Sequence, residues 1–286
     1  MTEPAAIAIQ ADWVTIDPAP AGAGGSLQGQ AGGGGGVPLR CWWARPLDQA
    51  PLAAVVVLPE VFGVNGWVRS VADRLAAAGY AALALNTMAR TAPDLELEYD
   101  PAGLERGRQH RDAVTASGFL ADLAASVAWL RAQPDLARAP IGCVGFCFGG
   151  HLALLAATDP AIQATCAFYG ARVSSFRPGG GPPSLELVPQ IPGRLWCFLG
   201  DQDPLIPPAE ITAVAAALTA ANGGLPADSP AARHRLLLAP GAGHGYMCEA
   251  RADFCADAAR AGWSEMLGLF KAMAWGGSQL PSQPNS

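Results

Sequence analysis

Apolar and polar positions follow one another along this chain in blocks that predict alternating strands and helices. From residue 53 onward, short continuous apolar runs are separated by stretches in which apolar residues recur three and four positions apart, the pattern of a helix with one buried face. The expected strands are 53–58, 80–85, 141–145, 164–168, 194–199 and 235–239. The expected helices lie near 68–78, 119–130, 149–157, 208–222 and 254–274.

This alternation predicts an α/β fold, a mostly parallel sheet with helices on both faces. Two earlier strands, 12–16 and 39–44, have no helix between them, so we expect them to form an antiparallel edge. Their connection, 19–36, is rich in glycine but lacks the Gly-Lys-Ser/Thr of a phosphate loop, which favours a solvent loop. Residues 87–115 have no clear period and are expected to pass over the edge of the sheet.

The sequence contains no repeat and no composition shift, so one domain is expected to span residues 1–286. Within it, 87–115 and the glycine-rich 176–189 are candidate lid segments. The 286 residues are 51% hydrophobic and 15% charged, which is enough apolar material for a large core. The net charge of −6 argues against nucleic acid or an anionic membrane as a partner.

The seven cysteines form no C-x-x-C pair, which argues against a disulfide scaffold or a zinc site. A reducing cytoplasm is the expected location. The N-terminal residues have no signal-peptide pattern, and no apolar run of about 18 residues predicts a membrane span.

The sequence GFCFGG places Cys147 between a predicted strand and a predicted helix, flanked by Gly145 and Gly149. In hydrolases this strand–turn–helix arrangement holds the nucleophile on a strained turn, usually as serine. A cysteine here would lie near the helix N-terminus, where free N–H groups and the helix dipole favour a thiolate. The backbone N–H of Phe148 would form half of an oxyanion hole. The alternative is a small buried side chain in a packing turn.

A nucleophile of this type requires a histidine base, and three histidines follow it. His151 comes directly after the turn, before any candidate acid, and His234 precedes an apolar strand, which favours a structural role. His244 follows the last predicted strand in PGAGHGY. Functional groups of open α/β sheets lie at this position, beyond the carboxyl ends of the strands, so His244 is the favoured base.

Candidate acids and anion-binding groups also follow strands. Asp201 and Asp203 in GDQDPLIP could each orient the histidine, although Asp also commonly forms turns. Glu60 lies just past strand 53–58 and is either a site group or a residue near a helix cap. Arg90 could bind a substrate carboxylate, and the alternative for it is a solvated loop charge.

The motifs PEVFGVN, MARTAP, GFCFGG, GDQDPLIP and GAGHGY occur in the order found in the dienelactone hydrolase (carboxymethylenebutenolidase) family, which this chain resembles from about residue 12 to about residue 275. The resemblance implies an α/β-hydrolase fold with about eight mostly parallel strands. It also implies hydrolysis of a small ester or lactone, expected to be anionic, without a metal or organic cofactor. The protein is expected to be a monomer or a small homo-oligomer.

Carried over by position, the resemblance implies a triad of Cys147, Asp203 and His244, with Glu60 helping to generate the thiolate when substrate binds. It implies that the backbone N–H groups of Val61 and Phe148 form the oxyanion hole, and that Arg90 holds the substrate carboxylate. Well-known family members carry a second carboxylate-binding arginine four residues after the histidine.

This sequence has Cys248 at the position of that second arginine, and Arg251 is the nearest arginine. Arg251 is therefore a further candidate for substrate binding. Three other interpretations are weighed: a thiol sensor of oxidants or electrophiles, a binding module without activity, and a hydrolase of another substrate class. The departure at Cys248 keeps the last of these open. Repeated turnover would distinguish an enzyme from a sensor, and a complete triad argues against a mere binding module.

Overall fold

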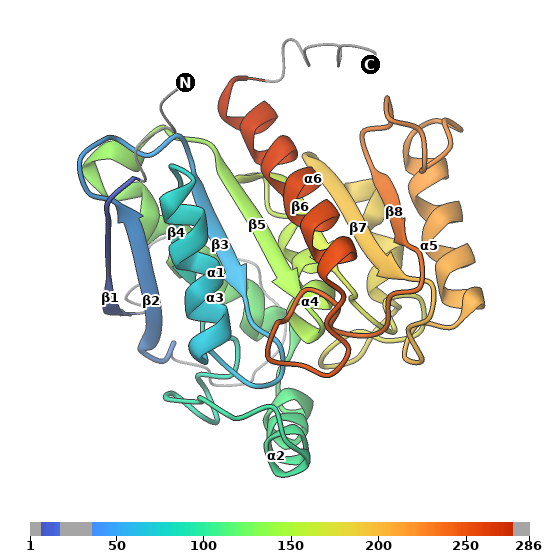
Figure 1. Ribbon diagram of the computed structural model, residues 1–286, viewed down its shortest axis with the longest axis horizontal. Helices are drawn as coiled ribbons and strands as arrows, with labels where there is room; N and C mark the ends of the chain where they lie inside the picture. Colours follow the sequence, from blue (N-terminus) through green and yellow to red (C-terminus); the bar gives the residue numbers. More distant parts are fainter. Residues whose placement is uncertain (1–6, 18–35, 277–286) are drawn as a thin grey trace, which may run out of the picture.

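The computed structural model describes residues 7–17 and 36–276, which form one eight-stranded sheet in the order β1-β2-β4-β3-β5-β6-β7-β8 (Figure 1). The strands are β1 Ile9–Ile16, β2 Leu39–Pro46, β3 Ala54–Leu58, β4 Ala81–Ala84, β5 Ile141–Phe146, β6 Ile162–Phe168, β7 Arg194–Gly200 and β8 Arg235–Ala239. The β1–β2 and β2–β4 pairs are antiparallel and every other pair is parallel. The predicted antiparallel edge and parallel centre are confirmed.

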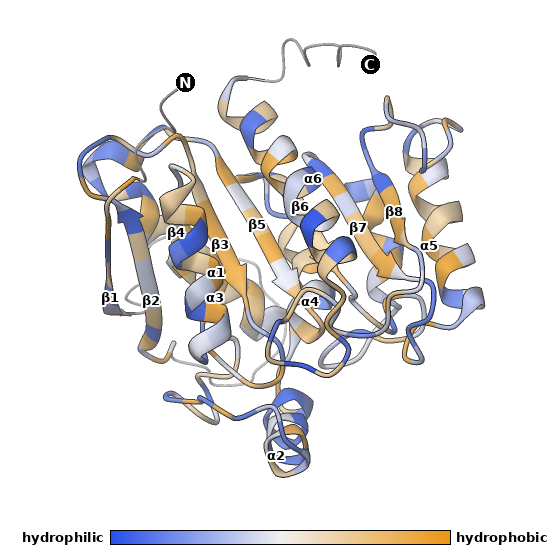
Figure 2. Cartoon of the chain, in the orientation of Figure 1, coloured by the Kyte–Doolittle hydropathy of each residue, from blue (hydrophilic) through white to orange (hydrophobic). Residues whose placement is uncertain are grey.

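Helices cover both faces of this sheet. They are α1 Gly66–Ala77, α2 Pro101–Asp112, α3 Ala116–Arg131, α4 Phe148–Ala156, α5 Pro208–Ala221 and α6 Ala256–Ala274, with 3₁₀ turns at Pro134–Leu136 and Ser184–Gln190. In Figure 1, α1 and α6 lie in front of the sheet, and α3 and α4 lie behind it. The central strand β3 is fully buried and is coloured as hydrophobic in Figure 2, as expected for a strand covered on both faces.

Helix α2 was not predicted, because its sequence PAGLERGRQHRD has no apolar stripe. Its only buried residues are Gly103 and Gly107, so hydrophobic periodicity gives no signal. The available signal is its start: Asp100 caps the first turn by accepting from the Gly103 N–H, and Pro101 follows at the first helical position. The expected path over the sheet edge was wrong for α2, which lies beyond the carboxyl ends of β3 and β5 (Figure 1).

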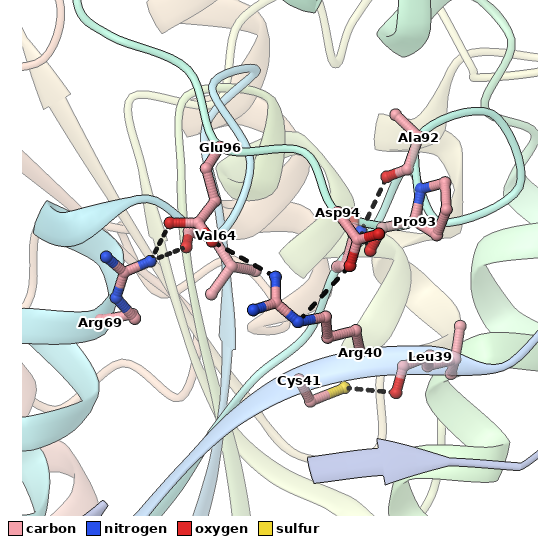
Figure 3. Close-up of polar contacts among 10 residues, drawn as sticks. Leu39, Arg40, Cys41, Val64, Arg69, Ala92, Pro93, Asp94 and Glu96 are labelled. Carbon is pink, nitrogen blue, oxygen red and sulfur yellow. Dashed lines mark hydrogen bonds and ion pairs between the residues drawn. The ribbon is translucent and has the colours of Figure 1, made fainter. Parts of the chain in front are cut away.

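Ion pairs fasten the connection from β4 to α2 onto β2 and α1 (Figure 3). On β2, Arg40 contacts Asp94 Oδ1 at 3.5 Å through Nε and Glu96 Oε1 at 3.3 Å through Nη1. On α1, Arg69 pairs with the other oxygen of Glu96. The Asn86 amide donates to two carbonyl oxygens of the same connection. These contacts hold the segment that leads into α2 against β2 and α1.

The glycine-rich connection expected at 19–36 lies outside the described residues except for residue 36. Within the described part of the chain, no single helix is long and apolar enough to cross a membrane. The pair α2 and α3 meets that test jointly by length and composition, with a bend of 93° between the two helices.

Candidate active site

The turn that holds Cys147 is a strained junction between β5 and α4. Cys147 has φ 54° and ψ −116°, a backbone conformation that side chains other than glycine rarely adopt. Its N–H donates to the carbonyl oxygen of Phe168 at 3.1 Å. A conformation of this kind costs free energy and persists only where its surroundings enforce it, which is common at catalytic sites.

Close backbone packing on both sides enforces this turn. A Cβ atom on Gly145 would lie 1.9 Å from the Gly149 carbonyl oxygen, and one on Gly149 would lie 2.3 Å from that of Leu58. Real Cβ contacts do not approach so closely. The packing therefore requires glycine at positions 145 and 149.

The loops that follow β7 and β8 bring Asp203 and His244 into contact. The Nδ1 atom of His244 lies 2.7 Å from Asp203 Oδ2, and both side chains are buried. The second oxygen of Asp203 accepts from the Leu205 N–H at 2.8 Å, which fixes the carboxylate in place. Asp201 is exposed and accepts instead from the Gly241 N–H at 2.7 Å, so it organises the neighbouring loop.

The other ring nitrogen of His244, Nε2, is buried and has no hydrogen-bond partner among the described residues. Burial lowers the pKa of His244, but negative charge on the Cys147 sulfur and the hydrogen bond to Asp203 raise it well above the usual value. A protonated imidazole is therefore the form of His244 that this environment favours. An unpartnered Nε2 next to a sulfur is a chemical arrangement suited to proton transfer.

Glu60 is fully buried two residues past the end of β3, where it pairs with Arg251. The Arg251 Nη1 atom donates to Glu60 Oε1 at 3.0 Å, whereas Glu60 Oε2 has no hydrogen-bond partner within the described residues. Burial raises the pKa of Glu60, and the Arg251 charge offsets this only in part. The buried Tyr169 packs edge-on against His244, with ring centroids 5.3 Å apart. Its hydroxyl group also has no hydrogen-bond partner among the described residues.

A cavity of about 440 Å³ lies over Cys147 and His244. Val61 and Phe148, whose backbone N–H groups are the expected oxyanion donors, line the same cavity. Phe148 is the first residue of α4, where an N–H group has no acceptor within the helix. The remaining lining residues are Arg108, Arg111, Asp112, His151, Ala171, Arg172, Phe176 and Leu205.

Arg90 does not line this cavity. It pairs with the buried Asp122 of α3 and borders a separate small cavity of about 20 Å³. The arginines that do line the main cavity are Arg108, Arg111 and Arg172, and none was a candidate from the sequence. No sequence signal marks them, because Arg108 and Arg111 lie in the unpredicted α2 and Arg172 is a single charge in a loop.

The two other histidines after the turn have structural partners. His151 lies between the Ala171 carbonyl oxygen at 2.9 Å and the Ser184 hydroxyl at 2.8 Å, and burial lowers its pKa. His234 accepts from the Leu195 N–H, and burial followed by the nearby Arg233 charge lowers its pKa to about 4. Both rings are held by the fold, which leaves His244 as the histidine available for proton transfer.

Comparison with known proteins identifies relatives of this chain. Residues 39–274 match the model of the dienelactone hydrolase family. A Synechocystis sp. protein provisionally named carboxymethylenebutenolidase is 35% identical over 228 residues, covering 80% of this chain and 89% of that protein. The carboxymethylenebutenolidase of Pseudomonas putida is 30% identical over 160 residues, covering 56% of this chain and 64% of that protein.

Among solved structures, a Klebsiella pneumoniae protein provisionally named dienelactone hydrolase superposes with a TM-score of 0.75 at 26% identity, covering 92% of this chain and 98% of that one. The predicted α/β-hydrolase fold is thereby confirmed: an eight-stranded, mostly parallel sheet places the cavity beyond the carboxyl ends of its strands.

Proposed function

This chain belongs to the dienelactone hydrolase family and is a hydrolase of ester or lactone bonds, and we propose that it acts through Cys147 by an acyl-thioester. The observation that carries the proposal is the buried Nε2 of His244, which has no partner among the described residues, while Asp203 orients the ring through Nδ1. His244 and Cys147 line the same cavity. A structural histidine would be bonded at both nitrogens, as His151 is.

In the first half of the proposed reaction, the Cys147 thiolate attacks the carbonyl carbon of the ester or lactone. The carbonyl oxygen takes the displaced electron pair and is stabilised by the N–H groups of Val61 and Phe148; loss of one such donor typically costs about 10²–10³-fold in rate. Collapse of this intermediate breaks the ester C–O bond and forms the thioester. The departing alkoxide takes the proton from the His244 imidazolium.

In the second half, His244 is neutral and serves as a base. It accepts a proton from water through Nε2 while the water oxygen attacks the thioester carbonyl. The C–S bond then breaks, which restores the Cys147 thiolate beside the imidazolium and releases a carboxylic acid. Asp203 stabilises the imidazolium form through Nδ1 in both halves.

Glu60 supplies the initial deprotonation in this proposal. Its raised pKa makes it a better proton acceptor than an exposed carboxylate, and one of its oxygens has no partner within the described residues. The bond from Arg251 holds the other oxygen, so Arg251 acts as a positioning residue for Glu60. The thiol proton passes to Glu60 as substrate enters, which leaves the thiolate ready for attack.

We extend the proposal to a single domain in a reducing cytoplasm, because seven cysteines without a C-x-x-C pair suit a compartment that keeps thiols reduced. The proposal includes a monomer or a small homo-oligomer as the assembly.

The proposal is tested with a panel of lactones and aryl esters on the wild type and Cys147→Ala, with Cys143→Ala as a matched control. Cys143 lies four residues earlier on β5, is fully buried and has its pKa raised by burial. We expect Cys147→Ala to lose turnover and Cys143→Ala to keep it, and mass spectrometry during turnover to find the acyl group on Cys147. Full-rate hydrolysis by Cys147→Ala would refute the mechanism.

A further inference from the structure

Three arginines line the cavity that contains Cys147 and His244, in a chain with a net charge of −6. Arg108 and Arg111 come from α2, and Arg172 comes from the segment after β6. Asp112 is the one acidic side chain among the lining residues, all of which belong to the described part of the chain. The cavity therefore carries an excess of positive charge that the composition of the protein does not predict.

The partners of these arginines leave two positive charges uncompensated. Arg111 pairs with Asp112 at 2.6 Å, so these two charges cancel. Arg108 forms no ion pair within the described residues. Arg172 stacks its guanidinium on Phe176, 4.7 Å from the ring centroid, which orients the group and leaves its N–H donors free.

Arg172 is also held in an unusual backbone conformation. Its φ is +62°, and it is one of three non-glycine residues with positive φ in the described chain, together with Cys147 and Tyr169. A left-handed backbone at a side chain without a local polar group costs about 1–3 kcal/mol and clusters at functional sites. A glycine would adopt this backbone conformation without that cost, yet the chain has an arginine here, and this arginine lines the cavity.

Helix α2, which carries Arg108 and Arg111, packs at Gly107 directly against Val61. A Cβ on Gly107 would lie 2.3 Å from the Val61 carbonyl oxygen, so the helix backbone touches the residue proposed to donate to the oxyanion. Arg108 and Arg111 are three residues apart and share one face of the helix. Arg106 and His110 border a different cavity on the other side of α2.

We propose that Arg108, Arg111 and Arg172 form the subsite for an anionic group of the substrate, so the enzyme prefers esters or lactones that carry a carboxylate on the acyl part. This inference rests on the proposed function and assigns the anion contact to α2 and the segment after β6 instead of Arg90. The remaining lining is largely apolar, with Val61, Phe148, Phe176 and Leu205. That combination suits a short carbon skeleton with one charged end.

The test uses two aryl esters of the same dicarboxylic acid, one with its second carboxyl free and one with it capped as a methyl ester. Specificity is the ratio of kcat/KM for the charged ester to that for the capped one. We expect Arg108→Ala and Arg172→Ala each to lower this ratio about tenfold, the scale for one charge-assisted hydrogen bond. The capped ester should change less than about twofold, because it makes no such bond, and Arg108→Lys should recover part of the ratio.

Two matched controls sharpen the result. Arg106→Ala removes a charge from the same helix but from the face that borders the other cavity, and should leave the ratio unchanged. Asp112→Asn removes the carboxylate that neutralises Arg111, and should raise the ratio, a gain that misfolding cannot mimic. Added salt should lower the wild-type ratio by screening exposed charges.

An unchanged ratio in the arginine variants, or a ratio that depends on Arg90→Ala, would overturn the assignment. That outcome is distinct from failure of the proposed function. If hydrolysis still requires Cys147 while the ratio ignores all three arginines, only the subsite is wrong. If Cys147→Ala remains active, the mechanism itself fails whatever the ratio shows.

Discussion

Replacing Asp203 by asparagine tests the proposed triad sharply, because the two carboxylate oxygens accept from different donors. Oδ1 accepts from the Leu205 N–H at 2.8 Å, and Oδ2 lies 2.7 Å from His244 Nδ1. An asparagine must keep an oxygen toward Leu205 to satisfy that donor, so its NH₂ group faces His244. The ring must then accept at Nδ1 and carry its proton on Nε2, which is the wrong tautomer for a base.

Two effects add in this variant. Loss of the charge-assisted hydrogen bond is worth about 1.5–3 kcal/mol, which is about 10- to 150-fold in rate. The tautomer change adds to this, and in a serine protease the equivalent change costs about 10⁴-fold. We therefore expect kcat for an aryl ester to fall by about 10²–10⁴ in Asp203→Asn.

The assay is kcat/KM against pH for wild type, Asp203→Asn and the control Asp201→Asn. Asp201 caps the neighbouring loop through Gly241 and does not contact His244, so its variant should stay close to wild type. Because Asp203 raises the pKa of His244, its removal should shift the alkaline limb of the profile to lower pH. A rate for Asp203→Asn within about threefold of wild type, or an unmoved limb, would refute the assigned role.

Three further outcomes are expected. The raised pKa of Glu60 means that its stabilising contribution is present below the unfolded-state pKa and lost as pH rises through the folded-state pKa. The free energy of unfolding, measured with denaturant, should therefore fall less steeply with pH in Glu60→Gln than in the wild type. An equal slope in the two proteins would contradict this. The free energy of unfolding of Arg172→Gly should exceed that of Arg172→Ala by about 1 kcal/mol, because only glycine relieves the backbone strain. Equal denaturation midpoints for the two variants would show that the backbone is not strained. Gly107→Ala should lower kcat at least tenfold by displacing Val61, whereas Gly268→Ala in α6, with open space around it, should stabilise by about 1 kcal/mol; an active Gly107→Ala enzyme would contradict the contact.

Much of the sheet could be predicted from sequence, because each central strand is buried on both faces and appears as a continuous apolar run. Strand 235–239 was predicted with the bounds that the structure gives to β8. Helix α2 could not be found in this way, since it buries only two glycines and its stability depends on backbone contact and caps. Periodicity detects side-chain burial, and this helix buries almost none.

In the candidate site, too, some features could be predicted from the sequence and others could not. Cys147 and His244 follow strands in the linear sequence, so the rule that functional groups collect at the carboxyl ends of strands made them candidates. The same rule left Asp201 and Asp203 open, and only the family resemblance favoured Asp203. Arg90 also follows a strand, yet its charge is taken up by Asp122, 32 residues later on α3. The sequence identifies where a side chain starts but not which distant partner neutralises it.

Arg251 shows how that neutralisation determines where an anion can bind. The residue four positions after His244 is Cys248, and Arg251 reaches the buried Glu60 from three residues further on. Its side chain crosses Gly245 so closely that a Cβ there would lie 2.4 Å from Arg251 Nε. A buried carboxylate strongly requires a partner, so Arg251 cannot leave Glu60 for a substrate without a large cost. With Arg90 paired to Asp122 as well, a charged substrate must find its cation among the arginines that line the cavity. Of these, Arg108 and Arg172 have no carboxylate partner among the described residues.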